Sequence, residues 1–284
     1  MVSWVKLPQS NSNVQHRVSL YRSGLATSGG ISPPLLSQLI PSGIKPGSML
    51  LVEFDPDSQW LPLATTLAAQ LHQMDHYICY LAMARPPSDV KEALTTQGID
   101  VGTAVKGGRL VVEDWYSASL SGGQVEAAGV RAGAFEIVDG ELRAKTLKVA
   151  DLSVEWLKTS KTGPKAYDIV DHWPPGSLVL VESFSTILRF NEEKPFVEWI
   201  ESRVNPEERR RRGITVQGLV RGIHSDWLYK RMESASDGVI DIRVMERGEE
   251  AKSLLRIRSL KGQPHDSRWH EIQIKPNGEV ALGP

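Results

Sequence analysis

The chain has 284 residues, and its 33 basic residues nearly balance its 34 acidic ones. This length allows one large α/β domain or two smaller ones, with a core that needs no disulfide or metal. A net charge of -1 gives no global attraction to nucleic acid or to an anionic membrane. The single cysteine, Cys79, lies in an apolar run and excludes a disulfide framework or a cysteine-rich zinc site. Without a secretory pattern or a bilayer-length apolar stretch, we expect a cytoplasmic protein with no membrane contact.

The first part of the chain differs in composition from the rest. Residues 1–39 are polar and rich in Ser, Asn and Pro, and we expect a mostly irregular N-terminal arm with a short strand near residues 18–21. From residue 40 onward, apolar runs alternate with amphipathic segments, and no repeat or linker interrupts them. Residues 40–284 are therefore predicted to form one domain.

The order of the elements predicts the fold class. The first half reads as a strand at 49–52, a helix at 62–72, a strand at 77–82, a helix at 89–97 and a strand at 109–113. A Gly- and Ala-rich segment at 119–144 is predicted to be a loop or insertion, and 147–159 to be helical. The second half reads as strands at 178–181, 216–223, 238–243, 253–258, 270–274 and 280–282, with helices at 195–203 and 229–234. Buried strands that alternate with helices predict an α/β fold with a mainly parallel sheet, and the final run of strands predicts an antiparallel edge.

The turn between the first strand and the first helix carries the strongest functional signal. Strand, turn and helix in this order form the frame of a P-loop, whose glycines expose backbone N–H groups to phosphate oxygens. A lysine and a hydroxyl complete such a site by binding the β and γ phosphates and magnesium. Residues 54–64 read FDPDSQWLPLA, so the frame is present while the glycines and the lysine are absent.

Five stretches of the chain resemble one family when they are taken together and in order. They are SGIKPGSMLLVE at 42–53, GRLVVEDWYS at 108–117, LVLVESFSTILRF at 178–190, GIHSDWLYKRMESASDGVIDIR at 222–243 and LRIRSLKGQPHDSRWHEIQI at 255–274. They resemble the KaiC-like branch of the RecA-type ATPase superfamily over roughly residues 40 to 282. The resemblance implies a RecA-like fold, often assembled in hexameric rings.

The resemblance aligns residues 54–64 with the family pattern GDPGSGKTTLA. The matching positions are Asp55, Pro56, Ser58, Leu63 and Ala64. The three glycines, the lysine and the magnesium-binding hydroxyl of the pattern are replaced, in that order, by Phe54, Asp57, Gln59, Trp60 and Leu61. Two unit charges about 4 Å apart at a protein surface interact by roughly 4 kcal/mol. A lost lysine and a gained carboxylate therefore predict a large loss of phosphate affinity.

Other positions that the family uses for catalysis are also altered. The aspartate of the Walker B strand, which holds magnesium, would fall at Glu182, followed by Ser183. The paired glutamates after the second strand would fall at Ala84 and Arg85, so the usual general base is absent. In the terminal hairpin, the family often carries a Lys-x-Arg-Gly that reads the γ-phosphate across a subunit interface. Here its lysine is lost and its arginine is replaced by Lys261, which cannot form a bidentate fork.

Three further features suggest other roles. His265 lies in the same hairpin as Lys261, and both are candidates for a contact between subunits. The basic run of Arg209, Arg210, Arg211 and Arg212 could contact the backbone of DNA, although such a run is more often a solvated loop or a subunit contact. Glu113 and Asp114 end a strand and could bind a metal together with Glu182, although a solvated strand end is the commoner case.

The first hypothesis is a catalytically inactive, KaiC-like pseudo-ATPase that needs no cofactor. Its partner would be further copies of itself, in a ring or other homo-oligomer, or an intact KaiC-like ATPase in a hetero-assembly. The second hypothesis is an accessory protein that binds single-stranded DNA through residues 209–212. The third is a residual, atypical ATPase that uses ATP with magnesium through Glu113, Asp114 and Glu182.

Overall fold

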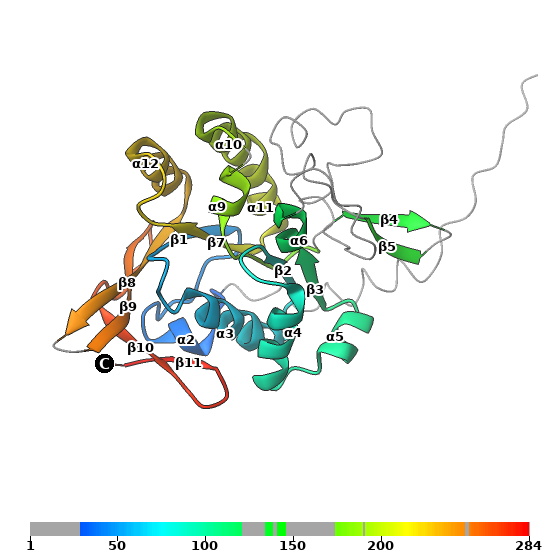
Figure 1. Cartoon of the computed structure of the whole chain (residues 1–284), viewed down its shortest axis with the longest axis horizontal. Coiled ribbons are helices and arrows are strands. Elements are labelled where there is room, and N and C mark those ends of the chain that lie inside the picture. Colours follow the sequence, from blue (N-terminus) through cyan, green and yellow to red (C-terminus); the bar gives the residue numbers. More distant parts are fainter. Residues whose placement is uncertain are drawn as a thin grey trace, which may run out of the picture.

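The computed structural model describes residues 29–120, 134–138, 141–145, 174–189, 191–247 and 250–283 (Figure 1). The strand expected near residues 18–21 and the helix expected at 147–159 lie outside these ranges. The boundary between an arm and a domain at residue 40 stays a prediction. No helix in the described ranges is long and apolar enough to cross a membrane.

A nine-stranded sheet forms the centre of the molecule, in the order β11-β10-β9-β8-β1-β7-β6-β2-β3. Its strands are β1 (Ser48–Phe54), β2 (Ile78–Ala82), β3 (Leu110–Asp114), β6 (Leu178–Val181), β7 (Ile214–Val220), β8 (Gly238–Arg247), β9 (Glu250–Leu260), β10 (His270–Ile274) and β11 (Val280–Leu282). The strands from β8 to β3 in this order pair in parallel, and β9, β10 and β11 pair antiparallel. The predicted α/β class and the antiparallel edge formed by the last strands are confirmed.

Helices cover both faces of the sheet (Figure 1). One layer contains α2 (Pro34–Ser37), α3 (Trp60–Gln73), α4 (Pro87–Thr96) and α5 (Val101–Lys106). The other contains α6 (Trp115–Leu120), α9 (Phe184–Leu188), α10 (Glu193–Trp199), η2 (Ile200–Val204, a π-helix), α11 (Asn205–Arg211) and α12 (Asp226–Ala235). Along β1, Leu50 and Val52 join the core under the first layer, and Met49 and Leu51 join the core under the second. Burial on both faces explains why the central strands read as continuous apolar runs.

The segment at 119–144 differs from the prediction. It was expected to be a loop or insertion, but β4 (Ala134–Val138) and β5 (Glu141–Lys145) form a separate two-stranded antiparallel sheet that begins inside it. The loop alternative was wrong for these residues, because it weighed the Gly and Ala content above the strand pattern, whereas an insertion stays a prediction. Asp139 and Gly140 lie between the two strands, and Asp-Gly is a common hairpin signal.

The helical prediction at 195–203 was too short. The helical segment begins at α10, passes through the π-helical turn η2 and continues through α11 to Arg211. Pro206 falls in the first turn of α11, where its missing N–H is tolerated. The short helices α5, α6 and α9 were not predicted, because five or six residues are too few to give a helical period.

Candidate functional site at the carboxyl edge of the sheet

The turn that resembles a P-loop lies at the carboxyl edge of the sheet, where sites in parallel α/β folds usually open. β1 ends at Phe54 and α3 begins at Trp60, so residues 55–59 form the turn. Pro56 and Asp57 are exposed at its tip. Asp57 therefore lies at the solvent-exposed tip of the turn.

The base of the turn is tied to the antiparallel edge strands. The Asp55 carboxylate accepts a hydrogen bond from the Val244 amide at 2.9 Å. The Gln59 amide donates to the Ser253 hydroxyl at 3.2 Å, and the Ser58 amide donates to the Asp55 carbonyl at 3.0 Å. The Ser58 hydroxyl is buried and has no hydrogen-bond partner among the residues that the structure describes. These contacts hold the turn against β8 and β9.

Trp60 fills the space beside the turn. Its side chain is fully buried, and its indole Nε1 donates to the Glu182 carbonyl oxygen at 2.7 Å. The Phe54 ring lies 5.8 Å from the Trp60 ring, centroid to centroid. A Cβ atom placed on Gly218 of β7 would lie 2.2 Å from the Glu182 carbonyl oxygen and 2.7 Å from Trp60 Nε1. The space between β1, β6 and β7 is thus packed so closely that only glycine fits at position 218.

Glu182 follows β6 and is fully buried, with both carboxylate oxygens engaged. Oε1 accepts hydrogen bonds from the Tyr80 hydroxyl at 2.7 Å and from Arg85 Nε at 3.0 Å. Oε2 accepts hydrogen bonds from the amides of Met83 and Ala84 at 2.8 and 2.9 Å. Four donors around one buried carboxylate satisfy the group without a metal ion.

Arg85 connects this carboxylate to the helix that follows the turn. Its Nη2 donates to the Leu61 carbonyl at 3.3 Å and to the Tyr80 hydroxyl at 3.1 Å. Burial, together with the charge of Glu182, raises the pKa of Tyr80 well above its usual range, so the phenol stays neutral and donates. Burial lowers the pKa of Arg85, but Tyr80 and Glu182 outweigh it and the net shift is upward. Arg85 is therefore a permanent cation within the site.

The other two acidic candidates, Glu113 and Asp114, accept hydrogen bonds from different partners. Glu113 is buried and accepts a hydrogen bond from Trp115 Nε1 at 2.9 Å. The Asp114 carboxylate accepts one from the Ser117 amide at 2.9 Å. Within the described ranges, no three His, Cys, Asp or Glu side chains are grouped so that they could hold a metal ion. Glu113, Asp114 and Glu182 therefore do not converge on a common point.

The hairpin residues lie far from the turn within one chain. Lys261 follows β9, and because Leu260 pairs with Gly238 at the start of β8, it lies at the amino edge of the sheet. Its Nζ donates to the Ser234 carbonyl at 2.7 Å. His265 Nδ1 is 3.0 Å from the Gln263 carbonyl oxygen. A role for Lys261 and His265 between subunits stays a prediction.

The basic run does not form one cationic surface. Arg209 lies 3.5 Å from an Asp237 carboxylate oxygen, and Arg210 pairs with Glu207. Arg211 points inward and is 3% exposed, with its Nε 3.0 Å from Glu207. Arg212 caps α11 in a left-handed conformation with φ of 58°. DNA binding by this run stays a prediction, and the inward direction of Arg211 does not favour it.

Two contacts at this edge were not predicted. The sequence analysis placed Arg85 only at the position of an absent glutamate, and its ion pair with Glu182 becomes visible only once β2 and β6 lie side by side. His224 Nε2 lies 2.8 Å from the Ser185 hydroxyl, which also accepts a hydrogen bond from the Val220 amide at 3.1 Å. Burial lowers the pKa of His224, so a neutral imidazole links α9 to the loop after β7.

A charged cluster lies on the same sheet beside β1. Arg258 Nη2 donates to a Glu53 carboxylate oxygen at 2.8 Å and to Glu233 at 2.9 Å. Arg243 lies 2.9 Å from Asp241 and 3.6 Å from Glu53. Burial raises the pKa of Glu53 to about 7, and Glu233 adds to this effect, against the opposing charge of Arg258. The cluster therefore contains a carboxyl group that titrates near neutral pH.

Comparison with known proteins gives a fold but no family. No protein-family model matches the sequence, and no curated protein sequence is similar to it. Among solved structures, a KaiC-like protein from the hyperthermophilic archaeon Pyrococcus horikoshii OT3 superposes with a TM-score of 0.59 at 16% identity. The match covers 90% of this chain and 99% of that protein. The class of the fold is RecA-type α/β. This chain shares that fold with the KaiC-like protein.

Proposed function

We propose that this protein is a non-catalytic, KaiC-like pseudo-ATPase that acts by binding other protein subunits. The observation that carries this proposal is the Glu182–Arg85 ion pair beneath the buried Trp60 indole. In the position where the fold would hold magnesium, the chain places its own cation. In the position where it would hold a lysine and phosphates, the chain places an aromatic ring.

The side chains at the turn do not fit a magnesium–triphosphate group. A phosphate cradle needs inward-pointing N–H groups, but the Gln59 amide already donates to Ser253 and the turn contains no glycine. A magnesium ion needs free carboxylate oxygens, but all four donors around Glu182 would compete with it. Entry of a nucleotide would therefore require both Trp60 and Arg85 to move.

A binding role follows from the parts that are intact. The nine-stranded sheet is complete and resembles the fold of a KaiC-like protein over 90% of the chain, which supports an intact scaffold around a filled turn. Lys261 remains exposed on the terminal hairpin, which the family resemblance assigns to contacts between subunits. We infer a homo-oligomer, or a hetero-assembly with an intact KaiC-like ATPase. Light scattering after size-exclusion chromatography tests the first form: a monomer at all concentrations would leave only the second.

Thermal unfolding with magnesium-ATP tests the loss of nucleotide binding. Ligand at 100 times its dissociation constant adds about 2.7 kcal/mol, which would raise Tm by several degrees. We expect no rise in Tm and no phosphate release. A rise of several degrees would contradict the proposal. Turnover that requires metal and disappears in Glu182→Gln would instead support the residual ATPase.

A further inference from the structure

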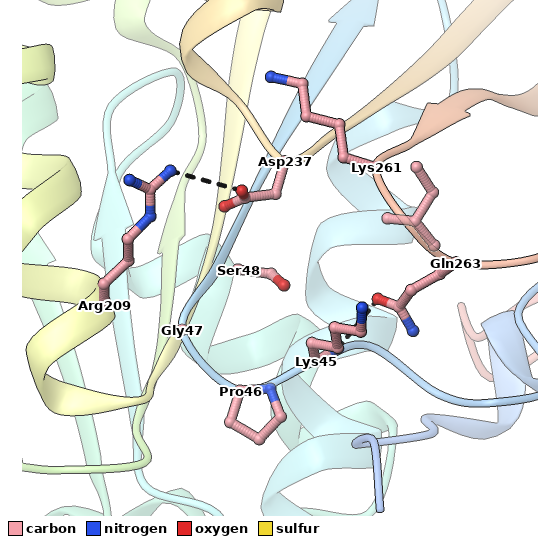
Figure 2. Close-up of a pocket in the computed structure, with 9 residues that line it drawn as sticks. Lys45, Pro46, Gly47, Ser48, Arg209, Asp237, Lys261 and Gln263 are labelled. Atoms are coloured by element: carbon pink, nitrogen blue, oxygen red, sulfur yellow. Dashed lines mark hydrogen bonds and ion pairs between the residues drawn. The ribbon is translucent and has the colours of Figure 1, made fainter.

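A cavity of about 300 Å³ opens at the amino edge of the sheet, at the opposite end of β1 from Trp60 (Figure 2). Its lining comes from four places in the sequence: the segment that leads into β1, helix α11, the turn before β8 and the turn after β9. The polar side chains that matter are Lys45, Ser48, Arg209, Asp237, Lys261 and Gln263. This volume suits a small molecule.

The cavity carries an excess of positive charge. Lys45, Arg209 and Lys261 contribute three cations, and Asp237 contributes one carboxylate, which leaves a formal charge of about +2 by the usual ionisation at pH 7. Lys45 Nζ donates to the Gly262 carbonyl at 3.1 Å, and Lys261 Nζ donates to the Ser234 carbonyl at 2.7 Å. Each ammonium group keeps further donors for a ligand, because it has three.

Ser48 places a hydroxyl group at the wall of the cavity. The residue is 6% exposed, and its hydroxyl points into the cavity (Figure 2). Among the residues that the structure describes, no protein group hydrogen-bonds to this hydroxyl. The hydroxyl oxygen is accessible from the cavity, so solvent satisfies it when no ligand is bound. A ligand oxygen in the cavity would take the place of that water.

The walls of the cavity are fixed by backbone contacts. Asp237 exchanges two hydrogen bonds with Met49: its carboxylate accepts from the Met49 amide at 3.0 Å, and its own amide donates to the Met49 carbonyl at 2.8 Å. The Asp237 carbonyl accepts from the Lys261 amide at 2.8 Å. Gln263 accepts from the Lys45 amide at 3.3 Å and donates to the Gly43 carbonyl at 2.6 Å. The site is therefore formed before any ligand enters.

We propose that this cavity binds a small phosphate monoester that carries a hydroxyl group. Near neutral pH such a phosphate is close to a dianion, which matches the charge of the site better than a single carboxylate does. Its oxygens would accept from the two lysines, Arg209 and Ser48. Asp237 Oδ1, which is 3.5 Å from Arg209, would accept from the ligand hydroxyl. This site is separate from the filled turn and does not depend on the proposed function.

Calorimetric titration with ribose 5-phosphate at low salt tests the proposal. We expect saturable binding, weakened about tenfold by Lys45→Gln and by Lys261→Gln, and several-fold by Ser48→Ala. Lys91→Gln is the matched control, because Lys91 is an exposed lysine on α4 outside the cavity, and it should leave affinity unchanged. Unchanged melting temperatures would show that the variants are folded. No binding at millimolar ligand, or equal binding by all variants, would overturn the site.

Two other ligands test which chemical groups the cavity recognises. Citrate offers carboxylates in place of phosphate, and equal affinity for citrate would overturn selection of a phosphate dianion. Inorganic phosphate lacks the sugar hydroxyls, and equal affinity for it would overturn the role given to Asp237. The Lys45→Gln/Lys261→Gln double variant also separates this site from the turn. A Tm rise with magnesium-ATP that survives in the double variant would arise at the turn and would count against the pseudo-ATPase alone.

Discussion

The two ends of β1 differ in whether the nearby polar groups are paired within the protein. At the carboxyl end, Glu182 is buried among four donors and the Trp60 ring closes the space above it. At the amino end, three cations surround an open cavity, and the Ser48 hydroxyl has no protein partner in the described part of the chain. Charges that are paired inside the protein support its fold, whereas charges that face a cavity without equal countercharge are available to a ligand.

Removing the ring at the closed end should have the largest effect. We expect Trp60→Ala to lower the free energy of unfolding by about 4 kcal/mol, because a fully buried tryptophan leaves a large cavity and an unpaired Glu182 carbonyl. Urea unfolding followed by circular dichroism measures this. Trp227→Ala is the control, since Trp227 is 44% exposed and should cost far less. Equal losses for the two variants would mean that the turn is not closed by Trp60.

Breaking the buried ion pair should have the second-largest effect on the free energy of unfolding. We expect Arg85→Met to cost about 3 kcal/mol, because it leaves the Glu182 charge buried with only its neutral donors. Arg231→Met makes the same change in the surface pair with Glu201, where about 0 to 1 kcal/mol is expected. The double variant Arg85→Met/Glu182→Gln should regain part of the loss. If Arg85→Met were as mild as Arg231→Met, the pair would not be a structural replacement for a metal.

The smallest expected effect is on the pH dependence of stability. The pKa of Glu53 is about 7 in the folded protein, above its ordinary value of 4.5, so the folded state holds the proton more tightly than the unfolded state. Stability from this group is present below pH 4.5 and is lost as pH rises through about 7. Melting temperatures between pH 5 and 8 should therefore fall more steeply in the wild type than in Glu53→Gln. Parallel curves would show that Arg258 keeps Glu53 ionised throughout.

The sequence predicted elements best where local pattern was sufficient. The bounds of β6, β10 and β11 agree with the prediction, because each is a short run bounded by turn residues. The hairpin of β4 and β5 was missed because its alternating pattern lies within a Gly- and Ala-rich segment. The helices α5, α6 and α9 were missed because they are only one to two turns long.

The residues of the candidate site could be predicted from the sequence, but the contacts between their side chains could not. The frame of the turn was identified from residue types and spacing, and its substituted positions and Glu182 were identified from the resemblance to the KaiC-like family. Arg85 is 97 residues from Glu182, and their contact depends on β2 lying next to β6. The amino-edge cavity has the same character, since Lys45, Arg209 and Lys261 meet only through the order of strands. Side-chain partners across a sheet require the topology, which local sequence does not contain.

Arg85 joins three separate parts of the chain, since it reaches Glu182 after β6, Tyr80 on β2 and the Leu61 carbonyl in α3. All the groups in this junction of Arg85, Glu182, Tyr80 and Leu61 belong to the same polypeptide, so none of them can dissociate. The junction therefore keeps β2, the end of β6 and the start of α3 in one arrangement for as long as these hydrogen bonds persist.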